Sequence, residues 1–312
     1  MRNNYTRRAA ELDAAFSAYE RAHGSLPGIL DPQRRETLFE QIIDSEQRVN
    51  FTTTLLTREL DPEATNPLST AFHPLKAAVL HHRAGDLDEA VWMVYLYVHF
   101  GRHRIAGWRY IRDTYGAFGS SEQQWWTWER TAGDPTSFRF WLDEHQADYR
   151  AAPGRHGFGN HHKYGSLAAW SEQGTGAAFE SYVRWVLAAG GDHLERFASL
   201  TAAAPEDTFD AMYRSLSAVR QFGRIARFDY LTMLGKLSLA DVRPPHTYLV
   251  GATGPLTGAR QLLNNDPMTG TARELQTKLT LLAAETRITP DVLEDAVCNW
   301  QKSMDRYIRF QG

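Results

Sequence analysis

The chain has 312 residues, a length that indicates one large domain or two closely joined lobes. Hydrophobic residues make up 43% of it and charged residues 23%, which excludes an intrinsically disordered or collagen-like chain. The formal net charge is −3, which disfavours a protein that holds DNA through an overall excess of basic residues, although a local basic cluster remains compatible with DNA binding.

The cysteine content and the apolar runs of the sequence indicate in which cellular compartment the protein resides. Cys298 is the only cysteine, so the chain cannot form an internal disulfide, as is typical of a reducing compartment. Residues 1–8 carry three arginines and lack the apolar stretch of a secretory signal. The most continuous apolar run, residues 90–100, is too short to cross a bilayer. We therefore expect a soluble, cytoplasmic protein.

Helical periodicity dominates the chain, and no Asn-Gly turn joins alternating β-branched runs. Thr289 followed by Pro290 is a specific start signal for the last helix. The segment 86–118 is expected to break near Gly101 or Gly107. We expect an all-α chain that folds as a single helical domain, 1–312, with two lobes at most. The predicted helices are 10–22, 33–60, 86–118, 135–149, 175–189, 207–234, 271–284 and 290–307.

A glycine-rich turn is predicted to join two helices at about 240–265. Gly251 and Gly254 form a G-x-x-G after an apolar stretch, and Pro255 leads the second helix. Unsatisfied N–H groups and the helix dipole at such a start favour a phosphate, as in helix–hairpin–helix proteins that grip DNA without reading its sequence. An ordinary turn between two helices has the same local pattern. The predicted DNA contacts are Gly251, Thr253, Gly254, Thr257 and Arg260.

Five segments, taken in this order, resemble one protein family: 41–48, 158–164, 222–231, 251–260 and 293–302. The family is α-glutamyl/putrescinyl-thymine pyrophosphorylase clade 3, and the resemblance covers roughly residues 26–312. It implies a fold related to that of helix–hairpin–helix DNA glycosylases. The other clades of the family belong to phage pathways that hypermodify thymine in DNA. A similar clade 3 protein is an anti-phage DNA glycosylase that removes glucosylated hydroxymethylcytosine.

Carboxylates downstream of the turn are the candidates for catalysis, because cleavage of an N-glycosidic bond needs one to stabilise the sugar cation or activate water. Asp295 and Glu294 are favoured, since they lie in a resembling segment close to a helix start. Asp266 and Glu274 lie nearer to the sequence distance usual in helix–hairpin–helix glycosylases. The alternative for the favoured pair is that both carboxylates only complement the helix dipole.

The glycine-flanked loop 151–165 provides an amide, an imidazole, an amine and a phenol for a substrate pocket. Lys163 is a candidate nucleophile for a Schiff base with the sugar, or a phosphate contact. Asn160, His161 and Tyr164 suit hydrogen bonds to a flipped base or to its appended sugar. A solvated polar loop is the alternative. We predict that this loop shares a cleft with the two favoured carboxylates.

Charged residues elsewhere extend the candidate site. Asp44, a catalytic candidate, and Arg48, a substrate-binding candidate, lie four residues apart on one helix face, where they form either a surface ion pair or part of the pocket. Asp229 and two neighbouring arginines frame an anion or form a structural salt bridge. His99 and His103 have a spacing found in metal sites, but no third ligand is evident. We therefore expect no metal and no cofactor.

Three functions remain open. We favour a DNA glycosylase, a hydrolase that flips out and excises a hypermodified base, expected to be α-glucosyl-5-hydroxymethylcytosine, from double-stranded phage DNA in anti-phage defence. The alternative is a transferase or pyrophosphorylase that acts on modified thymine during phage DNA hypermodification. The chain has no G-x-x-x-x-G-K-[ST] loop, which disfavours a nucleotide-dependent transferase. The third possibility, a non-catalytic DNA-binding module, should be more basic and would not need clustered polar groups.

Overall fold

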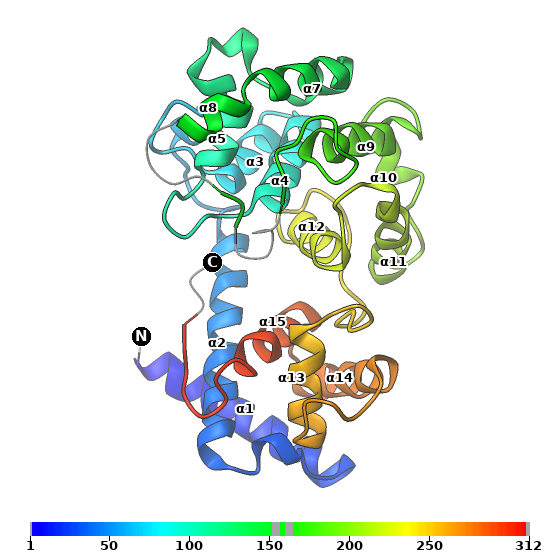
Figure 1. The fold of residues 1–312 in the computed structure, drawn as a ribbon. Helices are drawn as coiled ribbons and strands as arrows, with labels where there is room; N and C mark the ends of the chain where they lie inside the picture. The colour runs from blue at the N-terminus through cyan, green and yellow to red at the C-terminus, as the bar shows by residue number, and fades with distance from the viewer. Residues whose placement is uncertain (1, 152–156, 160–164, 310–312) are drawn as a thin grey trace. The chain divides into compact units, whose positions relative to one another are not determined.

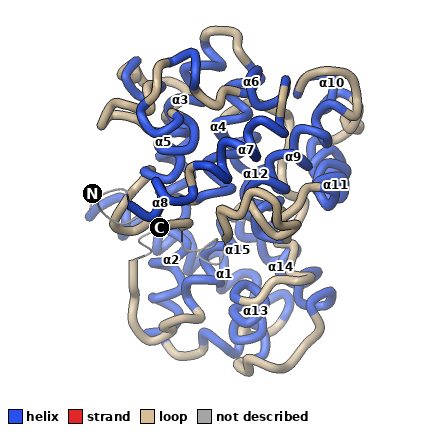
Figure 2. Tube along the Cα trace, turned by 45° about the horizontal axis from the view of Figure 1, so that its top comes forward, coloured by secondary structure: helices blue, strands red, loops and turns tan. Residues whose placement is uncertain are grey.

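The computed structural model describes residues 2–151, 157–159 and 165–309. These residues form helices joined by loops, and Figure 2 shows no strand among them. A single isolated bridge pairs His103 with Gly107. The predicted all-α class is therefore confirmed for the described part of the chain. None of its helices is both long and apolar enough to cross a membrane.

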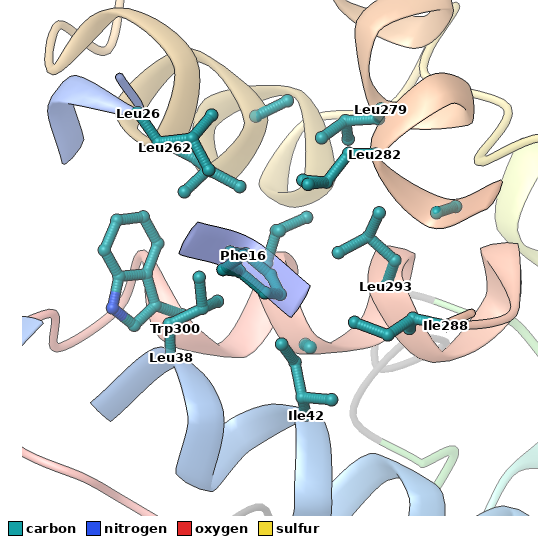
Figure 3. Close-up of a cluster of buried hydrophobic side chains, with 14 of the residues drawn as sticks. Phe16, Leu26, Leu38, Ile42, Leu262, Leu279, Leu282, Ile288, Leu293 and Trp300 are labelled. Carbon is teal, nitrogen blue, oxygen red and sulfur yellow. The ribbon is translucent and has the colours of Figure 1, made fainter. Parts of the chain in front are cut away.

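The first of two compact units combines both ends of the chain, Met1–Phe51 and Pro244–Gln311. Its helices enclose a core that includes Phe16, Leu293 and Trp300 (Figure 3). Removing these large apolar side chains from water is the main stabilising contribution to the unit. Its helices are α1 (Arg2–His23), η1 (Pro27–Ile29), α2 (Pro32–Thr54), α13 (Gly254–Asn264), α14 (Ala272–Thr286) and α15 (Pro290–Trp300) (Figure 1).

Glycines allow α13 and α15 to approach each other closely. A Cβ atom on Gly258 would lie 2.2 Å from the carbonyl oxygen of Val297, and one on Gly254 would lie 2.7 Å from Sγ of Cys298. Both distances are shorter than any Cβ contact a folded protein accepts without movement. The position of α15 therefore depends on the absence of side chains at these two positions of α13.

The segment after α15 runs back along α2 (Figure 1). Gln41 of α2 donates from Nε2 to the carbonyl oxygen of Ile308 at 3.0 Å, and Arg34 pairs with Asp305 at 2.7 Å. The helix predicted over 290–307 therefore ends earlier than expected, at Trp300. This return brings the polar residues that follow α15 next to α2.

The second compact unit, Thr52–Arg243, is built around α4 (Leu87–Phe100). This helix is apolar on nearly all sides and almost fully buried, as expected for a central helix. Gly101, with a φ of +64°, ends α4 where the sequence predicts a break. The other helices are η2 (Pro62–Thr65), α3 (Pro74–Arg83), α5 (Arg109–Tyr115), η3 (Ala117–Gly119), η4 (Glu122–Gln124), α6 (Trp128–Gly133), α7 (Pro135–Glu144), α8 (Gln146–Ala151), α9 (Thr175–Leu187), α10 (His193–Ala198), α11 (Pro205–Ser215), η6 (Leu216–Ala218) and α12 (Arg224–Lys236).

In the segment of about 240–265, where the sequence predicts a helix–hairpin–helix element, the structure has one helix, in the second half. Residues 237–253 form no helix, so the glycine turn has a helix, α13, on its C-terminal side only. Pro244 and Pro245 interrupt any helix within this segment, because proline has no N–H to donate and disfavours helical backbone in the residue before it. The predicted relation to the helix–hairpin–helix glycosylase fold is therefore not confirmed.

Candidate active site

Helix α15 presents a polar face opposite its core face. Thr289 is the N-cap residue and Pro290 occupies the first turn, as the sequence predicts. Leu293 packs in the core of the first unit. Asp295 and Asn299 are four residues apart and therefore share one face of the helix. On this helix Leu293 is fully buried, whereas the side chain of Asp295 keeps about a third of its surface exposed.

Arg48 of α2 lies between two carboxylates. Its Nη1 donates to Oδ2 of Asp44 on the same helix, and its Nη2 donates to Oδ2 of Asp295 on α15. The other oxygen of Asp295 accepts from Nδ2 of Asn299 at 2.9 Å, and Oδ1 of Asn299 accepts from Nζ of Lys302 at 2.8 Å. These five residues form one continuous chain of hydrogen bonds, which we call the Arg48 network.

Burial differs along the network. The side chain of Asp44 is only 9% exposed, whereas the side chains of Arg48 and Asp295 are 33% and 32% exposed. A buried carboxylate is costly unless it is paired, and Asp44 has Arg48 as a partner and Nε of Arg309 at 3.9 Å. Asp44 therefore anchors the network, while Asp295 and the guanidinium keep surface that a ligand can reach.

The two carboxylates keep the guanidinium of Arg48 charged. Burial acts to lower the pKa of Arg48, but Asp295 and Asp44 outweigh it and raise that pKa. Burial and the carboxylate of Asp44 raise the pKa of Tyr307 above its ordinary value, against the opposing effect of Arg309. The phenol therefore stays protonated at neutral pH and can donate a hydrogen bond. Arg48 bonds to both carboxylates, Arg309 lies near Asp44, and Lys302 bonds to Asn299.

The structure joins three residues that the sequence places in two separate segments. Asp44 and Arg48 form the expected ion pair on one helix, and Asp295, from the other end of the chain, forms a second ion pair with Arg48. Glu294, the other favoured carboxylate, is only 8% exposed and is therefore less accessible than Asp295. The catalytic roles of Asp44, Glu294 and Asp295 and the substrate-binding role of Arg48 stay predictions.

The two carboxylates nearer to the turn have local structural partners. Asp266 accepts from the N–H of Met268 at 2.9 Å and from the hydroxyl of Thr269 at 2.6 Å, bonds that lower its pKa, the hydroxyl contributing most. Glu274 completes a capping box with Thr271 at the start of α14. Both residues therefore stabilise the chain locally and do not belong to the Arg48 network.

Of the remaining predicted pocket residues, only Asp229 lies within the part of the chain that the structure describes. Asp229 lies on α12 of the second unit. The burial of Tyr97 and, to a lesser extent, the carboxylate of Asp229 raise the pKa of Tyr97 to about 12. The cleft predicted between the polar loop and α15 therefore stays a prediction. The loop residues outside the described part of the chain are Asn160, His161, Lys163 and Tyr164.

The glycine turn is open to solvent where it precedes α13. Gly251, with a φ of +80°, and Thr253 are exposed, and among the described residues no side chain caps the start of α13. Thr257 donates its hydroxyl to the carbonyl of Thr253 at 3.0 Å, and Arg260 donates to the carbonyl of Gly270 at 3.2 Å. The last two residues thus have structural partners, and binding of DNA by the turn stays a prediction.

Sequence reasoning assigned no role to four residues in or beside the network. Asn299 lies four residues after Asp295 and Lys302 three residues after Asn299, a helical spacing that signals contact. Tyr307 and Arg309 gave no such signal, because a helix continuing to residue 307 would carry them away from α2.

One protein-family model matches the chain over residues 33–312, and its description is alpha-glutamyl/putrescinyl thymine pyrophosphorylase clade 3. The match confirms the family that the five segments resemble, and it includes the whole Arg48 network. The predicted hydrolytic DNA glycosylase is wrong, because the description names a pyrophosphorylase, an enzyme that transfers a group to or from pyrophosphate. No curated protein and no solved structure matches the chain.

Proposed function

We propose, because the chain belongs to the α-glutamyl/putrescinyl-thymine pyrophosphorylase clade 3 family, that it exchanges pyrophosphate for an amine on a substituted thymine in DNA. The amine nitrogen forms a C–N bond to the exocyclic carbon of the thymine. The C–O bond between that carbon and pyrophosphate breaks, and pyrophosphate leaves with the electron pair. The additional proton on nitrogen passes to a base, so the overall reaction transfers the thymine methylene group from oxygen to nitrogen.

The Arg48 network supports this chemistry. Departing pyrophosphate carries several negative charges, which nearby cations stabilise as the C–O bond breaks. Arg48, Lys302 and Arg309 are the cations of the site. The attacking amine has to lose a proton, and Asp295 is a carboxylate that is one-third exposed and held in position by two hydrogen bonds.

The observation that carries the proposal is a guanidinium held between carboxylates of two helices, with an ammonium linked to it through Asn299 and Asp295. In this arrangement Asp44 fixes the guanidinium from its buried side. Asp295 is the proton acceptor. Lys302 and Arg309, the cations at the two ends of the site, would stabilise the departing pyrophosphate.

The glycine turn is the proposed contact to the DNA backbone. The start of α13 has no side-chain cap, and the positive end of a helix dipole binds phosphate through free backbone N–H groups. Such a contact positions DNA without reading its sequence. This suits an enzyme that recognises a modified base.

The test uses a duplex oligonucleotide in which one thymine carries a diphosphate on its exocyclic carbon, incubated with glutamate or putrescine. We expect release of pyrophosphate together with an oligonucleotide mass that corresponds to the amine adduct. Asp295→Asn should lower the rate at least about a hundredfold, as for loss of a general base. Asp266→Asn and Glu274→Gln, which change carboxylates outside the network, are the matched controls and should retain activity.

Two results would contradict the proposal. One is the absence of pyrophosphate release by the unaltered protein with either amine. The other is a full rate in the Asp295→Asn variant while the protein remains folded by circular dichroism.

A further inference from the structure

The loop that follows α4 is strongly basic. Residues 101–112 contain four arginines and no aspartate or glutamate. Arg102 and Arg104 are exposed, and no carboxylate in the described part of the chain forms an ion pair with either of them. By contrast, Nε of Arg112 donates to the carbonyl oxygen of Pro67 at 2.9 Å, which is a structural role. Two of the four guanidiniums are therefore available to an external anion.

The tip of this loop is a closed hairpin. The N–H of His103 donates to the carbonyl oxygen of Gly107 at 3.0 Å, and the N–H of Gly107 donates to the carbonyl oxygen of His103 at 2.9 Å. Inside the turn, Nδ1 of the His103 ring accepts from the N–H groups of Ile105 and Ala106, at 3.3 and 2.9 Å. These four bonds hold the tip in one arrangement. We call residues 102–107 the basic hairpin.

Packing fixes the basic hairpin on the second unit at both of its ends. After the hairpin, the ring centroid of Trp108 lies 5.2 Å from that of His73 and 5.4 Å from that of Tyr97. Before it, the carbonyl oxygen of Phe100 accepts from the N–H of Gly159 at 2.5 Å. A loop that is already ordered does not lose affinity to ordering when it binds a partner.

Ile105 is the large apolar residue of the tip, and it is 58% exposed. An exposed apolar side chain on its own indicates little. Here, however, backbone bonds hold it in the turn, and it lies next to Arg104 and three residues after Arg102. In a duplex, phosphates lie on both strands beside every step between stacked bases. One branched apolar side chain flanked by unpaired guanidiniums therefore suits insertion at such a step.

A lysine adds to the positive charge near the basic hairpin. Burial, followed by the charges of Lys76 and Arg102, lowers the pKa of His73 to about 4. Both cations therefore lie close enough to the His73 ring to act on it. Lys76 also has no ion-pair partner among the residues that the structure describes. Unpaired like charges repel one another, and a polyanion bound beside them offsets this repulsion.

These features favour DNA over a membrane as the partner. A protein that lies on a lipid surface buries a broad apolar face in it. Within residues 101–112, Ile105 is the one large apolar side chain that is exposed. A single apolar wedge is instead the device of proteins that unstack DNA, which insert residues such as Ile, Leu or Phe between base steps.

We propose that the basic hairpin binds duplex DNA, with Arg102 and Arg104 on backbone phosphates and Ile105 inserted between base pairs. Insertion unstacks the bases at that step, which lowers the free energy needed to extrude a base for reaction. The inference rests on the proposed function only in taking DNA as the substrate. The basic hairpin belongs to the second unit, whereas the Arg48 network and the glycine turn belong to the first.

The test measures, by fluorescence anisotropy, binding of the full chain to a fully paired duplex and to a duplex with one mismatched pair. Unstacking costs less at a mismatch, so the unaltered chain should bind the mismatched duplex at least about fivefold more tightly. Ile105→Ala should remove that preference. Arg102→Gln/Arg104→Gln should weaken binding to both duplexes equally, about tenfold, and reduce the slope of log affinity against log salt concentration by about 2.

Two matched controls separate these effects from general changes in polarity or charge. Leu194→Ala alters an apolar residue of the same unit that is 63% exposed. Arg21→Gln/Arg58→Gln removes two exposed arginines outside the basic hairpin. Both controls should bind the two duplexes like the unaltered chain. All the altered residues are exposed, so the circular dichroism spectra should also be unchanged.

Four results would overturn the proposal. They are no saturable binding of either duplex, a retained mismatch preference in Ile105→Ala, an equal loss of affinity in the two arginine double variants, and tighter binding to phosphatidylserine vesicles than to DNA, which would assign the basic hairpin to a membrane. The Asp295→Asn variant separates this proposal from the proposed reaction, because it should lose pyrophosphate release and keep the mismatch preference. Absence of pyrophosphate release by the unaltered chain would refute the reaction and leave the DNA-binding result standing.

Discussion

Replacing Gly258 by alanine tests what holds α15 in place. The new Cβ would lie 2.2 Å from the carbonyl oxygen of Val297, whereas ordinary contact begins at 3.4 Å. Because the obstructing atom belongs to the backbone, α13 and α15 have to separate by about 1 Å, which costs about 3 kcal/mol. Because alanine has a higher helix propensity than glycine, the substitution also stabilises α13 by about 1 kcal/mol. The expected net loss of stability is about 2 kcal/mol.

Urea denaturation followed by circular dichroism measures this loss. Gly133→Ala, at the end of α6, is the matched control, because no atom of the described residues lies within 4 Å of the added Cβ. Its stability should stay within about 0.5 kcal/mol of the unaltered chain. Since α15 carries Asp295, pyrophosphate release by Gly258→Ala should also fall under conditions in which the protein remains folded. Unchanged stability of Gly258→Ala would refute the argument that glycine sets the approach of the two helices.

Three further predictions concern stability. In urea denaturation, Arg48→Met should lower the free energy of unfolding by about 3 kcal/mol and Asp44→Asn should lower it by about 1 kcal/mol. Only the first variant removes the guanidinium that two carboxylates share, so a larger loss for Asp44→Asn would contradict this role of Arg48. Burial raises the folded pKa of Glu89 to about 7 from an ordinary 4.5, so the folded chain retains a proton that the unfolded chain loses. Protonated Glu89 therefore contributes fully to the free energy of unfolding below about pH 4.5, and that contribution falls by about 3 kcal/mol as the pH rises to about 7. Denaturation curves of Glu89→Gln, recorded over this pH range, should lack the fall. Thr271→Ala should cost about 1 kcal/mol in the same urea assay, because it opens the capping box of α14, and an unchanged midpoint would contradict that assignment.

Features that depend on neighbouring residues could be predicted from the sequence. Apolar spacing identified the helical class, and the break at Gly101 and the start of α15 at Pro290 followed from local backbone preferences. The Asp44–Arg48 pair followed from a spacing of four residues on one helix. The short helices α6 and α10 were missed, since six residues are too few for propensity to decide their structure.

The sequence by itself thus determined the all-helical class, the family and one half of the candidate site. Only the tertiary structure decided that Asp295 meets Arg48, 247 residues away, and that the chain turns back after Trp300 to lie along α2. The physical reason is that these contacts depend on how helices pack. The carbonyl oxygen of Val297 packs against Gly258 and so sets the distance between α13 and α15. The spacing of residues within either helix does not predict this distance.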